Sequence, residues 1–355
     1  MGTPQNLRVR ARVRVRRRWV VALLAIALVA IVVFALSQLD LARVGHALIT
    51  ATPGWIVLAL ALMGSSLVMR SISWHQVLRA ALPGIAIPWA PVVRATMIGV
   101  MGSAVFPGRV GEAARVLVLS RRLEGSTRQR VPVLAGTVFS QTLINLLALA
   151  ILLAVTFTSV PLLHGRLAGF AGALLVPLLV CVLVLIGPRL LVRAGRAKSP
   201  RVARAAHTVT RLLHLARRGL VVFARPRYGA PAIFFQLFAW ALQWLACYMV
   251  LLSLGLQSHG GLVAAAAILL AVNLSAVLPA TPSNVGVFQA ACLVVLAAYG
   301  VGAGPGLAYG IILQAVEVVT ALALGGPALL REGLSWREIR TSAGAVESAE
   351  DASVS

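Results

Sequence analysis

Two acidic residues lie inside long apolar stretches of this 355-residue chain. Glu112 directly follows the sequence FPGRVG, which contains Arg109, and Arg115 comes one helical turn later. Glu317 lies in the apolar sequence YGIILQAVEVVTAL. Ionisable groups at membrane depth normally face a partner or a water-filled cavity. We therefore predict that these four residues bind or translocate a substrate, with the carboxylates balancing charge or carrying a proton.

The spacing of these charges leaves two interpretations open. Glu112 and Arg115 are three residues apart, so they can form an ion pair on one face of a helix. That pair could bind substrate, or it could only hold the turn in place. Glu317 has no cation near it in the sequence, and we predict that it pairs with Arg109 across a cavity.

Amide side chains supply further candidates. Gln141 and Asn145 are four residues apart on one face of an apolar segment, a pattern that predicts hydrogen bonds between helices. The other amides lie around a second interruption of the apolar sequence, and we expect them to contribute to substrate binding. They are Asn273, Asn284 and Gln289.

The composition is that of a polytopic membrane protein. Hydrophobic residues make up 60% of the chain and charged residues 12%, whereas soluble domains contain about 25% charged residues. The net charge of +23 does not indicate nucleic-acid binding, because the arginines alternate with apolar segments as loop polarity requires. The cysteines Cys181, Cys247 and Cys292 lie in apolar runs without metal-ligand spacing. We therefore expect no metal, cofactor or nucleic acid, and the sequence contains no catalytic motif that would indicate an enzyme.

The distribution of basic residues predicts the topology. The segment 85–106 has arginines on both sides, so we expect a hairpin that enters from the cytoplasm, breaks at FPGRVG and returns. The segment 262–301 is broken at 278–286 and has neither Lys nor Arg in its flanks, which indicates entry from the outer side. With both termini inside, 27 of the 32 basic residues become cytoplasmic, Arg70 and Arg79 among them. The predicted fold is all-α, with two re-entrant hairpins and six full spans: 19–36, 54–69, 131–157, 167–186, 231–254 and 306–324.

The predicted domain organisation is a single membrane domain with basic cytoplasmic segments. Residues 1–18 form a basic arm, 19–330 the membrane domain, and 331–355 a disordered tail. A signal peptide is the alternative for the first apolar segment, which is longer than usual for one. The loop 187–230 reads as an amphipathic helix on the anionic inner leaflet, with four arginines on its polar face: Arg201, Arg204, Arg211 and Arg218.

The two breaks resemble each other and indicate an internal repeat. SAVFP at 103–107 recurs as SAVLP at 275–279, and each is followed by Gly and then Glu-Ala-Ala or Gln-Ala-Ala. Chance similarity of alanine-rich segments is the alternative. Because the hairpins enter from opposite sides, the halves, about 54–186 and 231–330, would be inverted repeats whose half-helix ends meet at a substrate site. The residues predicted to form the breaks are Pro107, Gly108, Gly111, Pro279, Pro282 and Gly286.

Two stretches, PGRVGEAARVLVLSRR and LPATPSNVGVFQAACLVVLAAYGV, resemble the lysylphosphatidylglycerol synthase transmembrane-domain family. These are flippase-like membrane proteins and include the flippase domain of multiple peptide resistance factor. The resemblance covers about residues 15–330. In the second motif, Asn284 stands where the family usually has glycine, and Gln289 where it has glutamate. The resemblance implies lipid translocation or a role in envelope lipid chemistry. We expect the soluble synthase domain of bifunctional members to be absent.

Three functions follow from these observations. The leading hypothesis is a transporter that moves a lipid or lipid-linked headgroup, preferably anionic, between leaflets of the bacterial plasma membrane. The alternatives are a membrane-embedded enzyme or enzyme subunit of envelope lipid modification, and a non-catalytic scaffold. We expect membrane lipids as partners, together with a second copy of the chain or an envelope enzyme. A composition almost free of lysine suggests a bacterium of high GC content.

Overall fold

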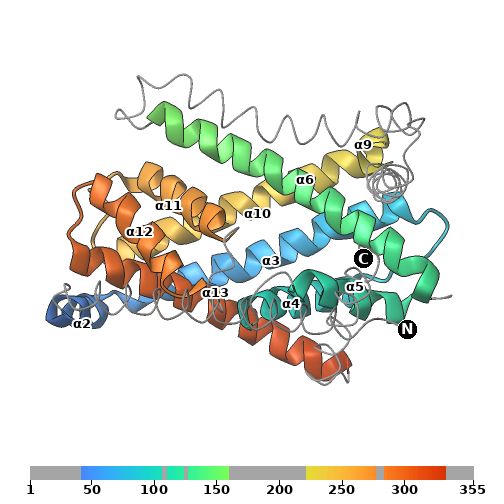
Figure 1. The fold of residues 1–355 in the computed structure, drawn as a ribbon, viewed down its shortest axis with the longest axis horizontal. Helices are drawn as coiled ribbons and strands as arrows, with labels where there is room; N and C mark the ends of the chain where they lie inside the picture. The colour runs from blue at the N-terminus through green and yellow to red at the C-terminus, as the bar shows by residue number, and fades with distance from the viewer. Residues whose placement is uncertain (1–40, 106–109, 124–126, 160–220, 277–283, 333–355) are drawn as a thin grey trace, which may run out of the picture.

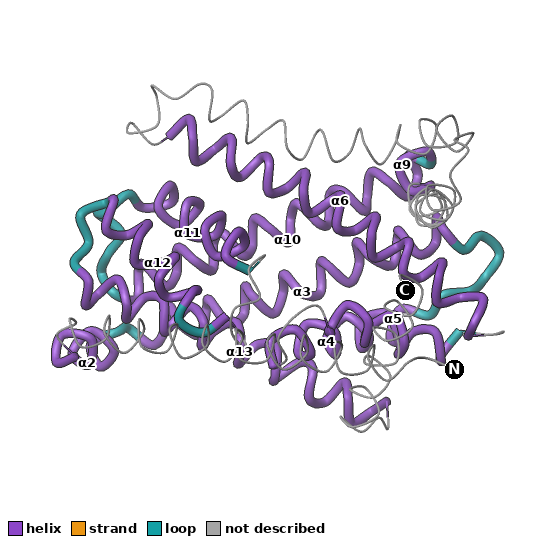
Figure 2. The backbone as a smooth tube through the Cα atoms, viewed as in Figure 1, coloured by secondary structure: helices purple, strands orange, loops and turns teal. Residues whose placement is uncertain are grey.

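The computed structural model describes residues 41–105, 110–123, 127–159, 221–276 and 284–332, and these residues form helices joined by short turns (Figures 1 and 2). The predicted spans 19–36 and 167–186 lie outside the described residues, as do the basic arm, residues 187–220 of the loop and residues 333–355 of the tail. The same holds for five residues of the two breaks: Pro107, Gly108, Arg109, Pro279 and Pro282. The helices are α2 (Leu41–Thr50), α3 (Pro53–Ala81), α4 (Trp89–Val105), α5 (Val110–Arg122), α6 (Thr127–Ser159), α9 (Val221–Ala224), α10 (Pro226–Ser253), α11 (Gly261–Ser275), α12 (Val287–Ala298) and α13 (Ala303–Glu332).

Four of these helices are long and apolar enough to cross a membrane. They are α3, α10, α13 and the part of α6 from Val133 to Thr156. The described residues contain no strand, so the prediction of an all-α membrane protein is confirmed. Of the six predicted spans, the four that are described each coincide with one of these helices.

Several helices extend beyond the predicted spans. α3 continues 12 residues beyond the predicted end at 69, because Trp74, Val77 and Leu78 keep an apolar face buried. Arg70 therefore lies in the interior of a membrane-length helix. Similarly, α10 begins at Pro226 inside the predicted loop, and α13 extends through Pro327 to Glu332.

The helices α3 and α10 form an antiparallel pair that defines two ends of the molecule. Each begins with a proline, which suits the first helical turn because its missing N–H would have no partner there. At one end the N–H of Thr52 donates to the carbonyl of Ser253 (2.8 Å). We call this the neutral end. Towards the other end Ser73 Oγ donates to the carbonyl of Ala232 (2.8 Å), and α3 finishes with Arg79 in its last turn. We call that the basic end.

The two pairs of short helices lie towards opposite ends of the molecule, an arrangement that fits the predicted entry from opposite sides (Figure 1). At the basic end Glu332, the last residue of α13, accepts hydrogen bonds from Arg94 of α4 (2.5 Å) and Arg122 of α5 (2.6 Å). Both outer ends of the α4–α5 hairpin therefore lie beside the end of α13. At the neutral end Nδ1 of His259 lies 3.2 Å from the carbonyl oxygen of Tyr299, which brings together the chain before α11 and the chain after α12. Each pair is therefore a hairpin whose two outer ends lie at the same end of the molecule, as the prediction of re-entrant hairpins requires.

Two apolar cores surround the hairpins. One, towards the neutral end, contains residues of α10, α11, α12 and α13, with Trp240 and Leu269 among its members. The other, towards the basic end, packs α4 and α5 against α3 and α6 around Trp74 and Leu119. Burial of apolar surface in these cores leaves the boundary between them for polar side chains.

A close crossing of α4 and α5 holds the first hairpin together. The backbone of Gly111 lies so near that of Gly99 that a Cβ on Gly111 would overlap the carbonyl oxygen of Gly99 and the atoms of Ser103. Small residues permit such approaches between membrane helices. Gly111, predicted as a residue of the break, thus lies in the first turn of α5 and serves close packing.

We expect Gly111→Ala to lower the free energy of unfolding by about 1–3 kcal/mol, because neither backbone can yield to the added methyl group. Gly326→Ala is the matched control, since a Cβ there meets nothing within 4 Å. The control should be neutral or stabilising by up to about 1 kcal/mol, as alanine favours helix. Unfolding by sodium dodecyl sulfate in mixed micelles measures both. Equal shifts in the two variants would contradict the close crossing.

Candidate functional site

Polar residues lie at the boundary between the two apolar cores and in the adjoining part of the core around Trp74. Along α3 the boundary falls between Met63 and Leu67, and along α6 between Ile144 and Ala148. Along α13, Val316 is the last residue of one core before Glu317. Buried polar groups at membrane depth need partners, and here they supply them to one another. We call this set the polar layer; it comprises Arg70, Glu112, Arg115, Gln141, Asn145, Gln236 and Glu317.

Arg115 is the best-partnered charge of the polar layer. Its Nη1 donates to Oε1 of Gln141 on α6 (2.7 Å), and its Nη2 forms an ion pair with Glu112, which confirms the predicted pairing. The guanidinium carbon lies 4.8 Å from the ring centre of Trp74 on α3, a favourable cation–π distance. The side chain of Glu112 is 42% exposed whereas that of Arg115 is 10% exposed, so the acid is the more accessible of the two, although its paired oxygen Oε2 is buried.

A relay of amides continues from Arg115 across three helices. Nε2 of Gln141 donates to the carbonyl of Arg70 (3.2 Å) and to Oε1 of Gln236 on α10 (3.3 Å). Nε2 of Gln236 in turn donates to Oδ1 of Asn145 (2.7 Å), which also accepts from Nε1 of Trp240 (3.1 Å). The predicted interhelical hydrogen bonds of Gln141 and Asn145 are therefore confirmed. They join α5, α6 and α10 at one level.

Arg70 and Glu317 are different, because they face each other without direct contact. Arg70 is the eighteenth of the 29 residues of α3, and Glu317 the fifteenth of the 30 residues of α13, so both lie near the middle of their helices. Arg70 interacts electrostatically with Glu112, Arg115 and Glu317. Within the described part of the chain, neither the guanidinium of Arg70 nor the carboxylate of Glu317 makes a hydrogen bond or an ion pair. The predicted partner of Glu317, Arg109, lies outside the described residues.

The sequence does not predict Arg70 as a site residue, because hydropathy falls at this residue and the predicted span therefore ends at residue 69. A usable signal was present. Ser66, Ser73 and Trp74 belong to a buried face that continues across Arg70 at helical spacing, which indicates one uninterrupted helix.

The amides of the second hairpin mainly hold its own backbone. Asn284, at a φ of 53°, donates from Nδ2 to the carbonyl of Ser275 (3.1 Å) and closes the break after α11. Oε1 of Gln289 accepts from the N–H of Gly286 (2.7 Å), a helix-capping contact, while its Nε2 donates to Gln314 on α13. Asn273 donates to the carbonyl of Leu269 in its own helix (2.8 Å). These residues position α11 and α12, and Gln289 ties the hairpin to α13.

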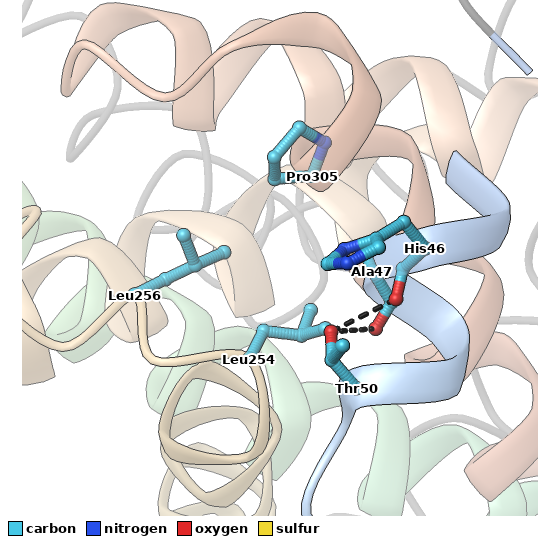
Figure 3. Close-up of a pocket in the computed structure, with 6 residues that line it drawn as sticks. All are labelled: His46, Ala47, Thr50, Leu254, Leu256 and Pro305. Atoms are coloured by element: carbon cyan, nitrogen blue, oxygen red, sulfur yellow. Dashed lines mark hydrogen bonds between the residues drawn. The ribbon is translucent and has the colours of Figure 1, made fainter. Parts of the chain in front are cut away.

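A pocket of about 320 Å³ lies at the neutral end, apart from the polar layer. It is formed by α2, which the sequence analysis missed, with the loop after α10 and the start of α13; its lining residues are His46, Ala47, Thr50, Leu254, Leu256 and Pro305 (Figure 3). The hydroxyl of Thr50 donates to the carbonyls of His46 (2.8 Å) and Ala47 (3.4 Å) and is satisfied within α2. The pocket contains none of the predicted site residues.

We expect Gln141→Leu to lower the free energy of unfolding by about 1.5–3 kcal/mol, the usual value of a hydrogen bond to a charged group. The substitution leaves Nη1 of Arg115 and Oε1 of Gln236 without their partner. Thr142→Val is the control on the same helix, because the hydroxyl of Thr142 only donates to the carbonyl of Val138 (3.1 Å). Unfolding in mixed micelles should separate the two variants clearly. Similar small losses in both would mean that the amide relay does not join the helices.

Comparison with known proteins agrees with this architecture. The family model described as lysylphosphatidylglycerol synthase TM region matches residues 19–325. No curated protein matches the chain at a significant level. The matched range contains both hairpins, the whole polar layer and nearly all of the four long helices. The family suggests an integral membrane protein of lipid modification or transport. The chain belongs to the lysylphosphatidylglycerol synthase transmembrane-region family.

Proposed function

We propose that this protein translocates a lipid or lipid-linked headgroup between the leaflets of the bacterial plasma membrane, with its basic end in the cytoplasm. One observation carries the proposal: two helical hairpins lie at opposite ends of the molecule, the first contributes Glu112 and Arg115 to the polar layer, and the second contacts α13 one turn before Glu317. Opposed broken helices with a site near the midplane are the general construction of membrane transporters.

The exterior of the helices is suited to lipid contact. Large apolar side chains are exposed on α6, α10 and α13, with Ile151, Phe234 and Val319 among them. A lipid could therefore keep its acyl chains outside the protein while its headgroup crosses at the polar layer. An ionic headgroup is costly in hydrocarbon, and charged side chains would replace the water that it loses.

Two acids of the polar layer are the groups that translocation would use. Glu112 is partly exposed although it is paired with Arg115, and Glu317 faces Arg70 without an ion pair. A stabilising role needs satisfied partners, whereas an unpaired acid at membrane depth destabilises the fold. Glu317 thus has the environment of a residue kept for function.

We expect Glu317→Gln to slow lipid translocation about tenfold or more, the loss that corresponds to one charge-assisted contact. The full chain is reconstituted in vesicles of phosphatidylglycerol and phosphatidylcholine, and leaflet exchange of acyl-labelled phosphatidylglycerol is followed by dithionite quenching. Glu112→Gln should also reduce the rate. Thr320→Val is the control on α13, because Thr320 Oγ1 donates only to the carbonyl of Val316 (2.7 Å).

Thermal stability distinguishes a functional acid from a structural one. Glu317→Gln removes an unpaired charge from the membrane interior and should leave the melting temperature equal or higher. A lower melting temperature together with unchanged translocation would assign Glu317 to the fold. Vesicles in which the wild-type protein moves no lipid, or in which it changes the lipid chemically, would overturn the proposal in favour of a scaffold or an enzyme.

A further inference from the structure

We infer that Arg70 is a phosphate-binding residue, and that within the proposed function it holds the phosphate of a lipid headgroup in the polar layer. The two described arginines of that layer, Arg70 and Arg115, differ in what their side chains contact. Both terminal nitrogens of Arg115 are engaged, one by Gln141 and the other by Glu112, and Trp74 covers its face. The buried Nε of Arg115 makes no hydrogen bond to the described residues, but both terminal nitrogens are occupied by the protein itself.

Arg70 carries the same charge without such contacts. Its backbone carbonyl accepts from Gln141, which fixes the position of the residue, but its guanidinium makes no polar contact with any described residue. The side chain is partly exposed and lies roughly 17 Å from the nearer end of α3, at a rise of 1.5 Å per residue. A guanidinium stays protonated, so at this depth it needs an anion or water.

The surroundings of Arg70 favour an anion with several oxygen atoms. Arg115 lies within electrostatic range and adds positive potential, while Glu112 and Glu317 interact with Arg70 from two other helices without an ion pair. A planar guanidinium can donate two parallel hydrogen bonds to a phosphate group. Neither Glu112 nor Glu317 is close enough to Arg70 to occupy these donors. The ligand that fits is a phosphate group.

The test measures whether binding depends on phosphate, and whether that dependence resides in Arg70. The purified full chain in detergent is titrated with dihexanoyl phosphatidylglycerol and with a dihexanoyl glucosyl diglyceride, which has a similar size but no phosphate. Native mass spectrometry or tryptophan fluorescence gives each Kd. The wild type should bind the phosphate lipid at least about tenfold more tightly, as expected for a charge-assisted bidentate contact.

Arg70→Gln should bring the ratio of the two Kd values close to one, and Arg70→Lys should retain part of the preference because it keeps the charge. Arg115→Gln should instead lower the melting temperature, since it breaks contacts to α3 and α6. A ratio unchanged in Arg70→Gln, or equal binding of both lipids by the wild type, would overturn the assignment.

Inorganic phosphate and glycerol phosphate distinguish a headgroup from a soluble ligand. If neither competes with the lipid at equal concentration, the site belongs to a lipid headgroup. The other outcome is that inorganic phosphate competes fully with the lipid and that Arg70→Gln abolishes this competition. Arg70 would then still be a phosphate-binding residue, but for a soluble ion, and only the proposed function would be contradicted. Absence of leaflet exchange likewise refutes only the proposed function, because the ratio of Kd values is measured without transport.

Discussion

The hydrogen bond from Arg115 to Gln141 is the contact on which the arrangement of the first hairpin depends. α5 has 13 residues and cannot cross a membrane, so its place along the bilayer normal is not set by length. A buried guanidinium sets it instead, because Arg115 must reach Gln141 on α6 while remaining beside Glu112 and Trp74. The amides beyond Gln141 then fix α6 against α10. The need to pair the charge of Arg115 thereby positions α5, α6 and α10 relative to one another.

The second half of the chain repeats this construction with neutral groups. Gln141 lies in the sequence FSQTLI and Gln314 in ILQAVE, each on the long helix that follows a hairpin. Gln314 accepts from Gln289 in the first turn of α12, as Gln141 accepts from Arg115 in α5. The two halves thus share the contact between half-helix and long helix. They differ in charge, and the acid of the second half is Glu317 on the long helix, not a residue of the hairpin.

The sequence allowed the hairpins to be predicted because their signals are local. Proline and glycine interrupt each apolar stretch, and the basic residues of the flanks show from which side it enters. The ends of α3 and α13 could not be predicted in this way, since hydropathy falls at Arg70 and at Gly325 although burial continues on one face. The contacts of Glu332 with Arg94 and Arg122 join residues more than 200 positions apart. No local pattern indicates such partners, and α2 lies in a loop too short to suggest a helix.

The separation of satisfied from unsatisfied charges explains how one layer can serve both stability and function. Arg115 and the amides are paired, so they resist movement of the helices that they join. Arg70 and Glu317 lie on the long helices α3 and α13 and interact electrostatically, without a hydrogen bond or ion pair to the described residues. α13 also holds one hairpin through Gln314 and the other through Glu332. A ligand bound at Glu317 would therefore contact the helix to which both hairpins are attached. Its binding could favour one arrangement of the two hairpins over another, to the extent that it binds that arrangement more tightly.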